Sequence, residues 1–256
     1  MRPTPLHLAA ARLSRAAYLD SPEAELGASL AVRDLPVEAK IVDCGGGTQV
    51  LLAGRFVAFR GTDELADVAD DLGCLARPVS GLVRAWGRAP AWHRGFERAW
   101  KRAEPFVSAY VRPSVPGGYR GCGPIVYCGH SLGGALAMLA AAHSPCPVDV
   151  VTFGAPRAGN EMAVNRAQNR AITMARFVMN SDIVPRLPPT SSGLVHPSRG
   201  FYYIDSDGTI HESPSWAFCA TDRIRGRLRG GVLDSFRDHS MDGYVAALVG
   251  SASRRA

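Results

Sequence analysis

Short apolar runs alternate with segments of helical spacing along most of the chain. The runs have the length and composition of strands that are buried on both faces, as in a parallel sheet. Between them, apolar residues recur every three or four positions, which is typical of helices that pack on a sheet. The predicted strands are 37–42, 48–52, 55–59, 125–128, 148–153 and 173–179; the predicted helices include Leu8–Tyr18, a segment ending near Val111, 132–143 and one opening near Met241. This alternation predicts an α/β fold, with a mostly parallel central sheet and helices on both faces.

The pattern predicts one domain over residues 1–256. The chain has 256 residues, 46% hydrophobic and 20% charged, a composition that allows a sizeable core. No linker, repeat or low-complexity run divides it. Turn residues at Ala53-Gly54 and around Asp207-Gly208 predict two hairpins.

The net charge of +6 is carried almost entirely by arginine. The densest group is interspersed with glycine and contains no aromatic residue, which favours a solvated loop over a nucleic-acid site. This group consists of Arg223, Arg225, Arg227 and Arg229. Elsewhere arginines are scattered among acidic residues, so we expect no nucleic-acid partner.

No run in the sequence is long and apolar enough to cross a bilayer, so we expect no stable membrane insertion. The apolar stretch 6–11 is short, and Arg12 and Arg15 interrupt it, so no signal peptide is visible. We therefore expect the protein to be cytoplasmic or exported without a conventional leader. The six cysteines form no C-x-x-C pair, which favours free buried thiols over disulfides or a zinc site.

One stretch carries a clear signal of nucleophilic chemistry. The run 125–128 leads into Gly129-His130-Ser131-Leu132-Gly133, and a helix-forming segment follows. A serine at the apex of a strand–turn–helix unit is a nucleophile elbow. The apex residue has a strained backbone, so glycines are needed two positions before and after it, where side chains would clash. Gly129 and Gly133 occupy those positions, and Ser131 is the candidate nucleophile.

Acyl transfer also needs hydrogen-bond donors for the oxyanion of its tetrahedral intermediate. The backbone N–H of Leu132, directly after the serine, is one candidate. Thr62, at the end of the strand 55–59, is the other, through its N–H and its hydroxyl. Residues 63–90 then mix acidic with spaced apolar positions. They form a candidate lid over an apolar cleft, with a plain surface helix as the alternative.

The candidate acid is Asp182, just past the predicted end of the strand 173–179. Catalytic residues of open α/β sheets collect at the carboxyl ends of strands. A carboxylate at this point would orient a histidine and stabilise its imidazolium. The competing acids Asp205 and Asp207 lie in a predicted hairpin and are better explained as turn residues.

The candidate base is His239, which precedes the helix opening near Met241 and is the last histidine of the chain. The order Ser131, Asp182, His239 is the serine–acid–histidine order of α/β-hydrolases. His196 and His211 also follow Asp182 and remain alternative bases. His93 precedes the serine, and we interpret it as structural.

Several motifs in this order resemble the class 3 lipase family, the filamentous-fungal lipase type of α/β-hydrolase. They are Phe59-Arg60-Gly61-Thr62, His93-Arg94-Gly95-Phe96, Gly129-His130-Ser131-Leu132-Gly133-Gly134, Phe153-Gly154-Ala155-Pro156-Arg157, Ser181-Asp182-Ile183-Val184-Pro185 and His239. The resemblance implies an α/β-hydrolase fold. It also implies a triad of Ser131, Asp182 and His239, an oxyanion pair of Thr62 and Leu132, and a lid just after Thr62.

These observations predict a serine carboxylic-ester hydrolase, a lipase or esterase that needs no metal or organic cofactor. Its expected partners are lipid or small ester substrates, with transient contact between the lid and a lipid interface. The segment 63–72 is acidic and lacks the aromatic residue of fungal lids, which favours soluble or short-chain esters. The alternatives are a phospholipase A1, a thioesterase or an acyltransferase with the same triad, or an inactive binding protein on the same fold.

Overall fold

In the part of the chain that the structure describes, eight strands form one sheet whose spatial order follows their order in the chain. The computed structural model describes residues 3–19, 39–61, 89–111, 123–230 and 238–253. The strands are β1 (Ala39–Asp43), β2 (Gln49–Ala53), β3 (Phe56–Phe59), β4 (Ile125–His130), β5 (Val148–Phe153), β6 (Ala171–Met179), β7 (Phe201–Ile204) and β8 (Ile210–Glu212). Strands β3 to β7 are parallel, whereas β1, β2 and β8 pair antiparallel at the two edges.

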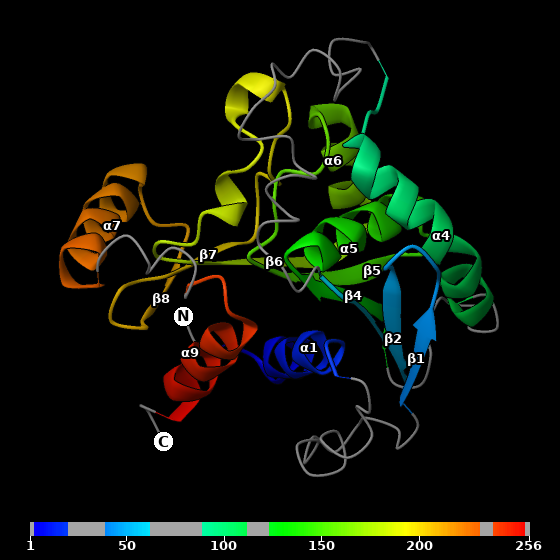
Figure 1. Cartoon of the computed structure of the whole chain (residues 1–256), viewed down its shortest axis with the longest axis horizontal. Coiled ribbons are helices and arrows are strands. Elements are labelled where there is room, and N and C mark those ends of the chain that lie inside the picture. Colours follow the sequence, from blue (N-terminus) through cyan, green and yellow to red (C-terminus); the bar gives the residue numbers. More distant parts are fainter. Residues whose placement is uncertain (1–2, 20–38, 62–88, 112–122, 231–237, 254–256) are drawn as a thin grey trace.

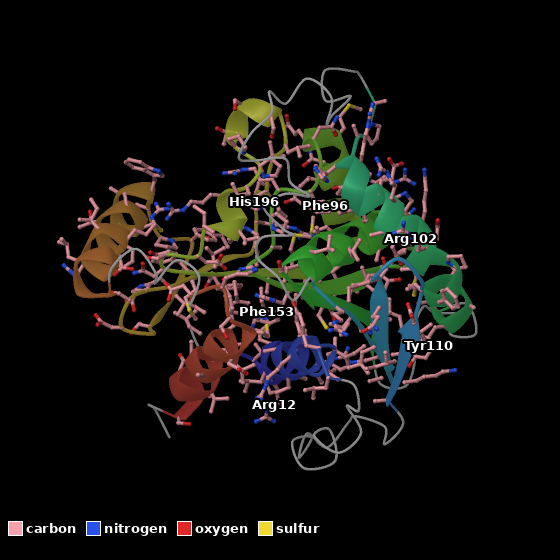
Figure 2. The ribbon with its side chains drawn as sticks, viewed as in Figure 1. Arg12, Phe96, Arg102, Tyr110, Phe153 and His196 are labelled. Carbon is pink, nitrogen blue, oxygen red and sulfur yellow. The ribbon has the colours of Figure 1, made fainter. Side chains whose placement is uncertain are left out.

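Two groups of helices cover the sheet, as Figure 1 shows. One face carries α4 (Arg94–Val111), α5 (Leu132–His143) and α6 (Glu161–Arg170), and the other carries α1 (Pro5–Ala16) and α9 (Met241–Ser253). Every residue of β4 and β5 is buried, as the apolar runs in these segments predicted. In Figure 2 Phe153, at the end of β5, lies between the sheet and helices α1 and α9. The predicted mostly parallel α/β architecture with helices on both faces is confirmed.

Helix α1 begins and ends earlier than the predicted Leu8–Tyr18 segment. Thr4 caps it, since its hydroxyl accepts from the His7 N–H while the Thr4 N–H donates to Nδ1 of His7. Pro5 occupies the first helical turn, where a missing N–H costs nothing. The apolar spacing identified the buried face of this helix, but the cap determines where the helix begins.

The prediction of a solvated loop around the arginine cluster is wrong. Residues Trp216–Gly230 form helix α7, which lies at the edge of the molecule beside β7 and β8 (Figure 1). Its buried face is narrow and built from small or polar residues, Cys219, Asp222 and Gly226. A helix with this inner face shows no apolar periodicity that points toward a core.

Other predictions concern residues that the structure does not describe. Thr62 and most of the candidate lid 63–90 lie outside the described residues, and the single domain over 1–256 stays a prediction. Within the described ranges the cysteines Cys44, Cys128, Cys146 and Cys219 are free thiols. Among the described helices, none combines the length and the apolar composition that crossing a membrane requires.

Candidate active site

Ser131 lies at a strained turn between β4 and α5. Its backbone has φ 56° and ψ −127°, a conformation that is rare for a residue with a side chain. The neighbouring glycines make room for it: a Cβ at Gly129 would overlap the backbone of Gly133, and a Cβ at Gly133 would overlap the carbonyl of Phe59. The two glycines therefore let the turn pack directly against β3, and the serine is held at its apex.

Asp182 and His239 form a buried pair beside this turn. Nδ1 of His239 lies 2.9 and 3.0 Å from the two carboxylate oxygens of Asp182. Two further donors reach the same carboxylate, namely the Val184 N–H at 3.0 Å and the Tyr244 hydroxyl at 2.7 Å. Gly154 leaves the space for this pair, because a Cβ there would lie 2.7 Å from an Asp182 oxygen and 3.1 Å from Nδ1 of His239. The carboxylate is thus fully engaged and fixed in position.

This pairing determines the tautomer of the histidine. A carboxylate only accepts hydrogen bonds, so Nδ1 of His239 carries the proton and Nε2 presents its lone pair. Among the described residues neither Nε2 of His239 nor Oγ of Ser131 has a hydrogen-bond partner, although both atoms are buried. A buried polar atom without a partner costs free energy, and such atoms gather where a substrate supplies the missing partner.

His130 connects the turn with the histidine pair. Its ring packs on that of His239, with centroids 4.4 Å apart, and its Nδ1 lies 2.8 Å from the Tyr18 hydroxyl. Burial holds the pKa of His130 well below its usual value, and the nearby His239 lowers that pKa further. His130 is therefore neutral at neutral pH and adds no positive charge beside His239.

Of the two candidate oxyanion donors, the structure describes Leu132. Leu132 is the first residue of α5, where a backbone N–H has no intrahelical acceptor and the helix dipole favours negative charge. The loop after β3 approaches the same point, since a Cβ on Gly61 would lie 3.2 Å from Cβ of Ser131. Thr62 itself is not described, but the residue before it touches the elbow.

The competing histidines and acids have other partners. Nε2 of His196 lies 2.6 Å from the Pro185 carbonyl, and Nε2 of His211 lies 2.7 Å from Asp205. Asp205 also accepts the Asp207 and Thr209 N–H groups, so it is a turn residue. These contacts leave His239 as the histidine that the structure brings to Asp182.

His93 stands at the start of α4 with its ring 4.5 Å from that of Phe96. Burial, followed by the charge of Arg98, lowers its pKa to about 4. Within the described part of the chain its two ring nitrogens have no hydrogen-bond partner. Its neutral, packed ring fits the structural interpretation.

Sequence reasoning missed two tyrosines at the site. Tyr244 lies on α9, where its spacing from Met241 and Leu248 indicates only an apolar helix face, yet its hydroxyl donates to Asp182 and accepts the Met179 N–H at 3.0 Å. Tyr18 follows α1 and reaches His130 across 112 residues of sequence. The only available signal was that a buried tyrosine hydroxyl needs a hydrogen-bond partner. That rule does not identify the partner.

The mostly parallel sheet with helices on both faces and the strained serine turn between β4 and α5 are features of the α/β-hydrolase class. Within this class, the family described as "Lipase (class 3)" matches residues 56–192, more than half of the chain. The chain belongs to the class 3 lipase family, and the resemblance inferred from its motifs is confirmed.

Similar proteins agree with this assignment. A Fusarium solani protein named secreted mono- and diacylglycerol lipase 1 is 35% identical over 130 residues, 47% of this chain and 38% of that protein. A Rhizomucor miehei lipase is 27% identical over 164 residues, 59% of this chain and 42% of that protein. The chain thus spans about two fifths of the length of these curated relatives. A solved lipase from Rhizopus microsporus var. chinensis has a TM-score of 0.59 at 21% identity, covering 80% of this chain and 76% of that one, which shows the fold.

Proposed function

We propose that this protein is a serine carboxylic-ester hydrolase, with Ser131 as nucleophile, His239 as base and Asp182 as the acid that orients it. The observation that carries the proposal is the buried Asp182–His239 pair, whose histidine ring packs on that of His130, the residue directly before the strained Ser131. The pairing fixes the histidine in the tautomer that accepts a proton, which is what activation of a serine hydroxyl requires.

The first half-reaction forms an acyl-enzyme. His239 Nε2 takes the Ser131 proton while Oγ attacks the ester carbonyl, and the oxyanion is held by the N–H groups of Leu132 and Thr62. When the tetrahedral intermediate collapses, the bond to the alcohol breaks, and the imidazolium protonates the departing oxygen. Asp182 stabilises the imidazolium in between.

The second half-reaction repeats these steps with water as the nucleophile. His239 deprotonates the water, the acyl group leaves Ser131, and Oγ recovers its proton from the imidazolium. Tyr244 and the Val184 N–H keep the Asp182 carboxylate in place through both halves. His130 remains neutral beside His239, so the positive charge that develops there meets no second positive charge.

We propose that the substrates are lipid esters, with acylglycerols as the leading candidates. Support comes from membership of the class 3 lipases and from the mono- and diacylglycerol lipase name of the Fusarium solani relative. The acidic candidate lid favours the shorter, more soluble members of that class. Contact of this segment with a lipid interface belongs to the same proposal.

The test is hydrolysis of p-nitrophenyl esters from acetate to palmitate by the wild type, Ser131→Ala and a matched Ser253→Ala control on α9. We expect Ser131→Ala to lose on the order of 10⁶-fold in kcat and the control to keep full activity. An organophosphonate probe should label the wild type at Ser131. An unlabelled wild type that hydrolyses no ester of the series would overturn the proposal.

A further inference from the structure

Helix α7 exposes an apolar stripe on the side that faces away from the protein. Trp216, Ile224 and Leu228 are 80%, 62% and 83% exposed. Ile224 and Leu228 are four residues apart, and Ala217 and Ala220 extend the same side toward the first turn. Single exposed apolar residues are ordinary, but three large ones on one helix form a surface that suits a partner.

The opposite side of α7 is firmly attached to the fold. Asp222 is buried and accepts from Asn180 at 2.6 Å, from the Tyr203 hydroxyl at 2.9 Å and from Ser206 at 2.7 Å. Gly226 packs on Asn180, since a Cβ there would lie 2.8 Å from its side-chain oxygen. The helix therefore cannot turn its apolar stripe inward without breaking this buried network.

The charge of α7 is strongly one-sided. Its sequence contains four arginines and a single acid, and that acid, Asp222, is turned into the protein. Arg225 is exposed, and Arg223 donates from Nε to the Cys219 carbonyl at 2.9 Å while remaining partly exposed. The outer surface of the helix thus combines apolar side chains with positive charge and carries no acidic residue.

We propose that α7 docks the protein on the surface of an anionic lipid bilayer. A helix with Trp, Ile and Leu on one face and arginines around it lies in the plane of the interface. Its apolar side chains enter the acyl boundary and its cations pair with headgroups. Tryptophan favours this depth because its ring is apolar and its N–H is polar. Each arginine near an anionic surface strengthens binding by about fivefold.

The docking surface lies close to the proposed catalytic residues. Asn180, which contacts both Asp222 and Gly226 of α7, is separated from Asp182 only by Ser181. Ser181 donates in turn to the Asn180 side-chain oxygen at 2.6 Å. A bilayer held against α7 would therefore rest on the helix whose buried face contacts the loop that carries the triad acid.

The same surface is poorly suited to other occupants. A second copy of the chain would bring two arginine-rich helices into contact, and their like charges would repel each other. A nucleic acid would use the arginines but would leave Ile224 and Leu228 without an apolar environment. The lipid surface is the partner that satisfies both the charge and the apolar stripe.

The test measures sedimentation with vesicles of equimolar phosphatidylcholine and phosphatidylglycerol, all proteins carrying Ser131→Ala so that no lipid is cleaved. Ile224→Asp/Leu228→Asp should weaken vesicle binding by more than about tenfold. The control Met162→Asp/Val249→Asp changes two exposed apolar residues on α6 and α9, with the same change in charge, and should bind like the parent. Binding should also fall with added salt.

The α7 variant with Ser131 restored should keep its melting temperature and its hydrolysis of soluble esters, which excludes misfolding. The inference would be overturned by a parent protein that does not sediment with anionic vesicles, or by a control that loses binding as much as the α7 variant. Duplex DNA binding without vesicle binding would also overturn it. Vesicle binding does not need ester hydrolysis, so failure of the proposed function would leave this result unaffected.

Discussion

The elbow (residues 129–134) and the acid loop (residues 180–184) hold neighbouring parts of one site by opposite means. The elbow depends on missing side chains, since Gly129 and Gly133 let the chain pass where any Cβ would overlap backbone. The acid loop depends on side chains contributed by other segments, because His239 and Tyr244 both hydrogen-bond to Asp182. The first is a steric solution within a few residues, and the second is a hydrogen-bond network drawn from distant segments.

This difference teaches that the two regions should fail differently. A side chain added at an elbow glycine forces backbone to move, so it should first cost stability. A substitution in the acid loop leaves the backbone free to keep its path but misorients a proton acceptor, so it should first cost turnover.

Among the changes that test this comparison, the largest expected effect is on turnover, from Asp182→Asn. An amide of the same shape cannot stabilise the imidazolium and favours the wrong tautomer, so kcat should fall about 10⁴-fold. The melting temperature should change little by comparison. Ester hydrolysis measures the first quantity and thermal unfolding the second.

The matched control for this change is Asp205→Asn, which alters a turn carboxylate that contacts His211. It should keep wild-type kcat. If Asp182→Asn instead kept near-normal turnover, another acid would have to orient the base.

Gly133→Ala should have the next largest effect, and it should fall on stability. The new Cβ would meet the Phe59 carbonyl, a backbone atom that cannot rotate away. We expect the free energy of unfolding to fall by about 3 kcal/mol. Denaturant unfolding of the purified variant measures this loss.

Gly243→Ala on α9 is the control for that experiment, because its Cβ would lie 3.4 Å from Met179 in ordinary contact. It should be neutral or stabilising by up to about 1 kcal/mol. Equal losses in the two variants would mean that the elbow has no special steric demand.

The third prediction uses pH, because the elbow contains a buried titratable ring. The pKa of His130 is lower in the folded than in the unfolded protein, so the unfolded state binds more protons below pH 6.5. The contribution of this group to stability is therefore lost as pH falls below about 6.5, where the histidine of the unfolded chain takes up its proton.

His7 and His93 shift in the same direction, so the wild type alone does not isolate His130. The difference between the wild type and His130→Gln isolates the contribution of His130, because glutamine can keep the hydrogen bond to Tyr18 and does not titrate. The pH slope of the unfolding free energy should be shallower in the variant. Parallel slopes would contradict the assignment.

The smallest effect is expected from Tyr244→Phe. Removing one of several donors to Asp182 should loosen the carboxylate and lower kcat about tenfold. KM should stay unchanged, because the hydroxyl does not face the substrate. Tyr110→Phe, which removes a hydrogen bond to the Gly54 carbonyl far from the site, should leave kcat unaltered. A tenfold loss in both would mean a general packing defect.

The same contrast explains how much could be predicted from sequence. The parallel strands and the elbow follow from local patterns: apolar runs, and glycines at fixed offsets from Ser131. Asp182 and His239 were found through chain order and strand ends. The additional hydrogen-bond donors to Asp182 were not predicted, because nothing near Asp182 in sequence points to Tyr244, 62 residues later.

Helix α7 escaped prediction for a different physical reason. Sequence patterns detect a helix by the apolar face that it buries, whereas this helix buries Cys219, Asp222 and Gly226 and exposes Ile224 and Leu228. Glycine within and after the arginine cluster then favours a loop. A helix that buries small or polar residues and exposes apolar ones becomes recognisable only when the partners of its buried polar groups are known.

The distances in sequence between the site residues also have a consequence for biosynthesis. The ring of His239 reaches a carboxylate 57 residues earlier, and Tyr18 reaches a ring 112 residues later. Contacts of such long range form late in folding. During translation the Asp182–His239 pair therefore cannot form until His239 has left the ribosome and docked, so the proposed activity needs both segments to be folded together.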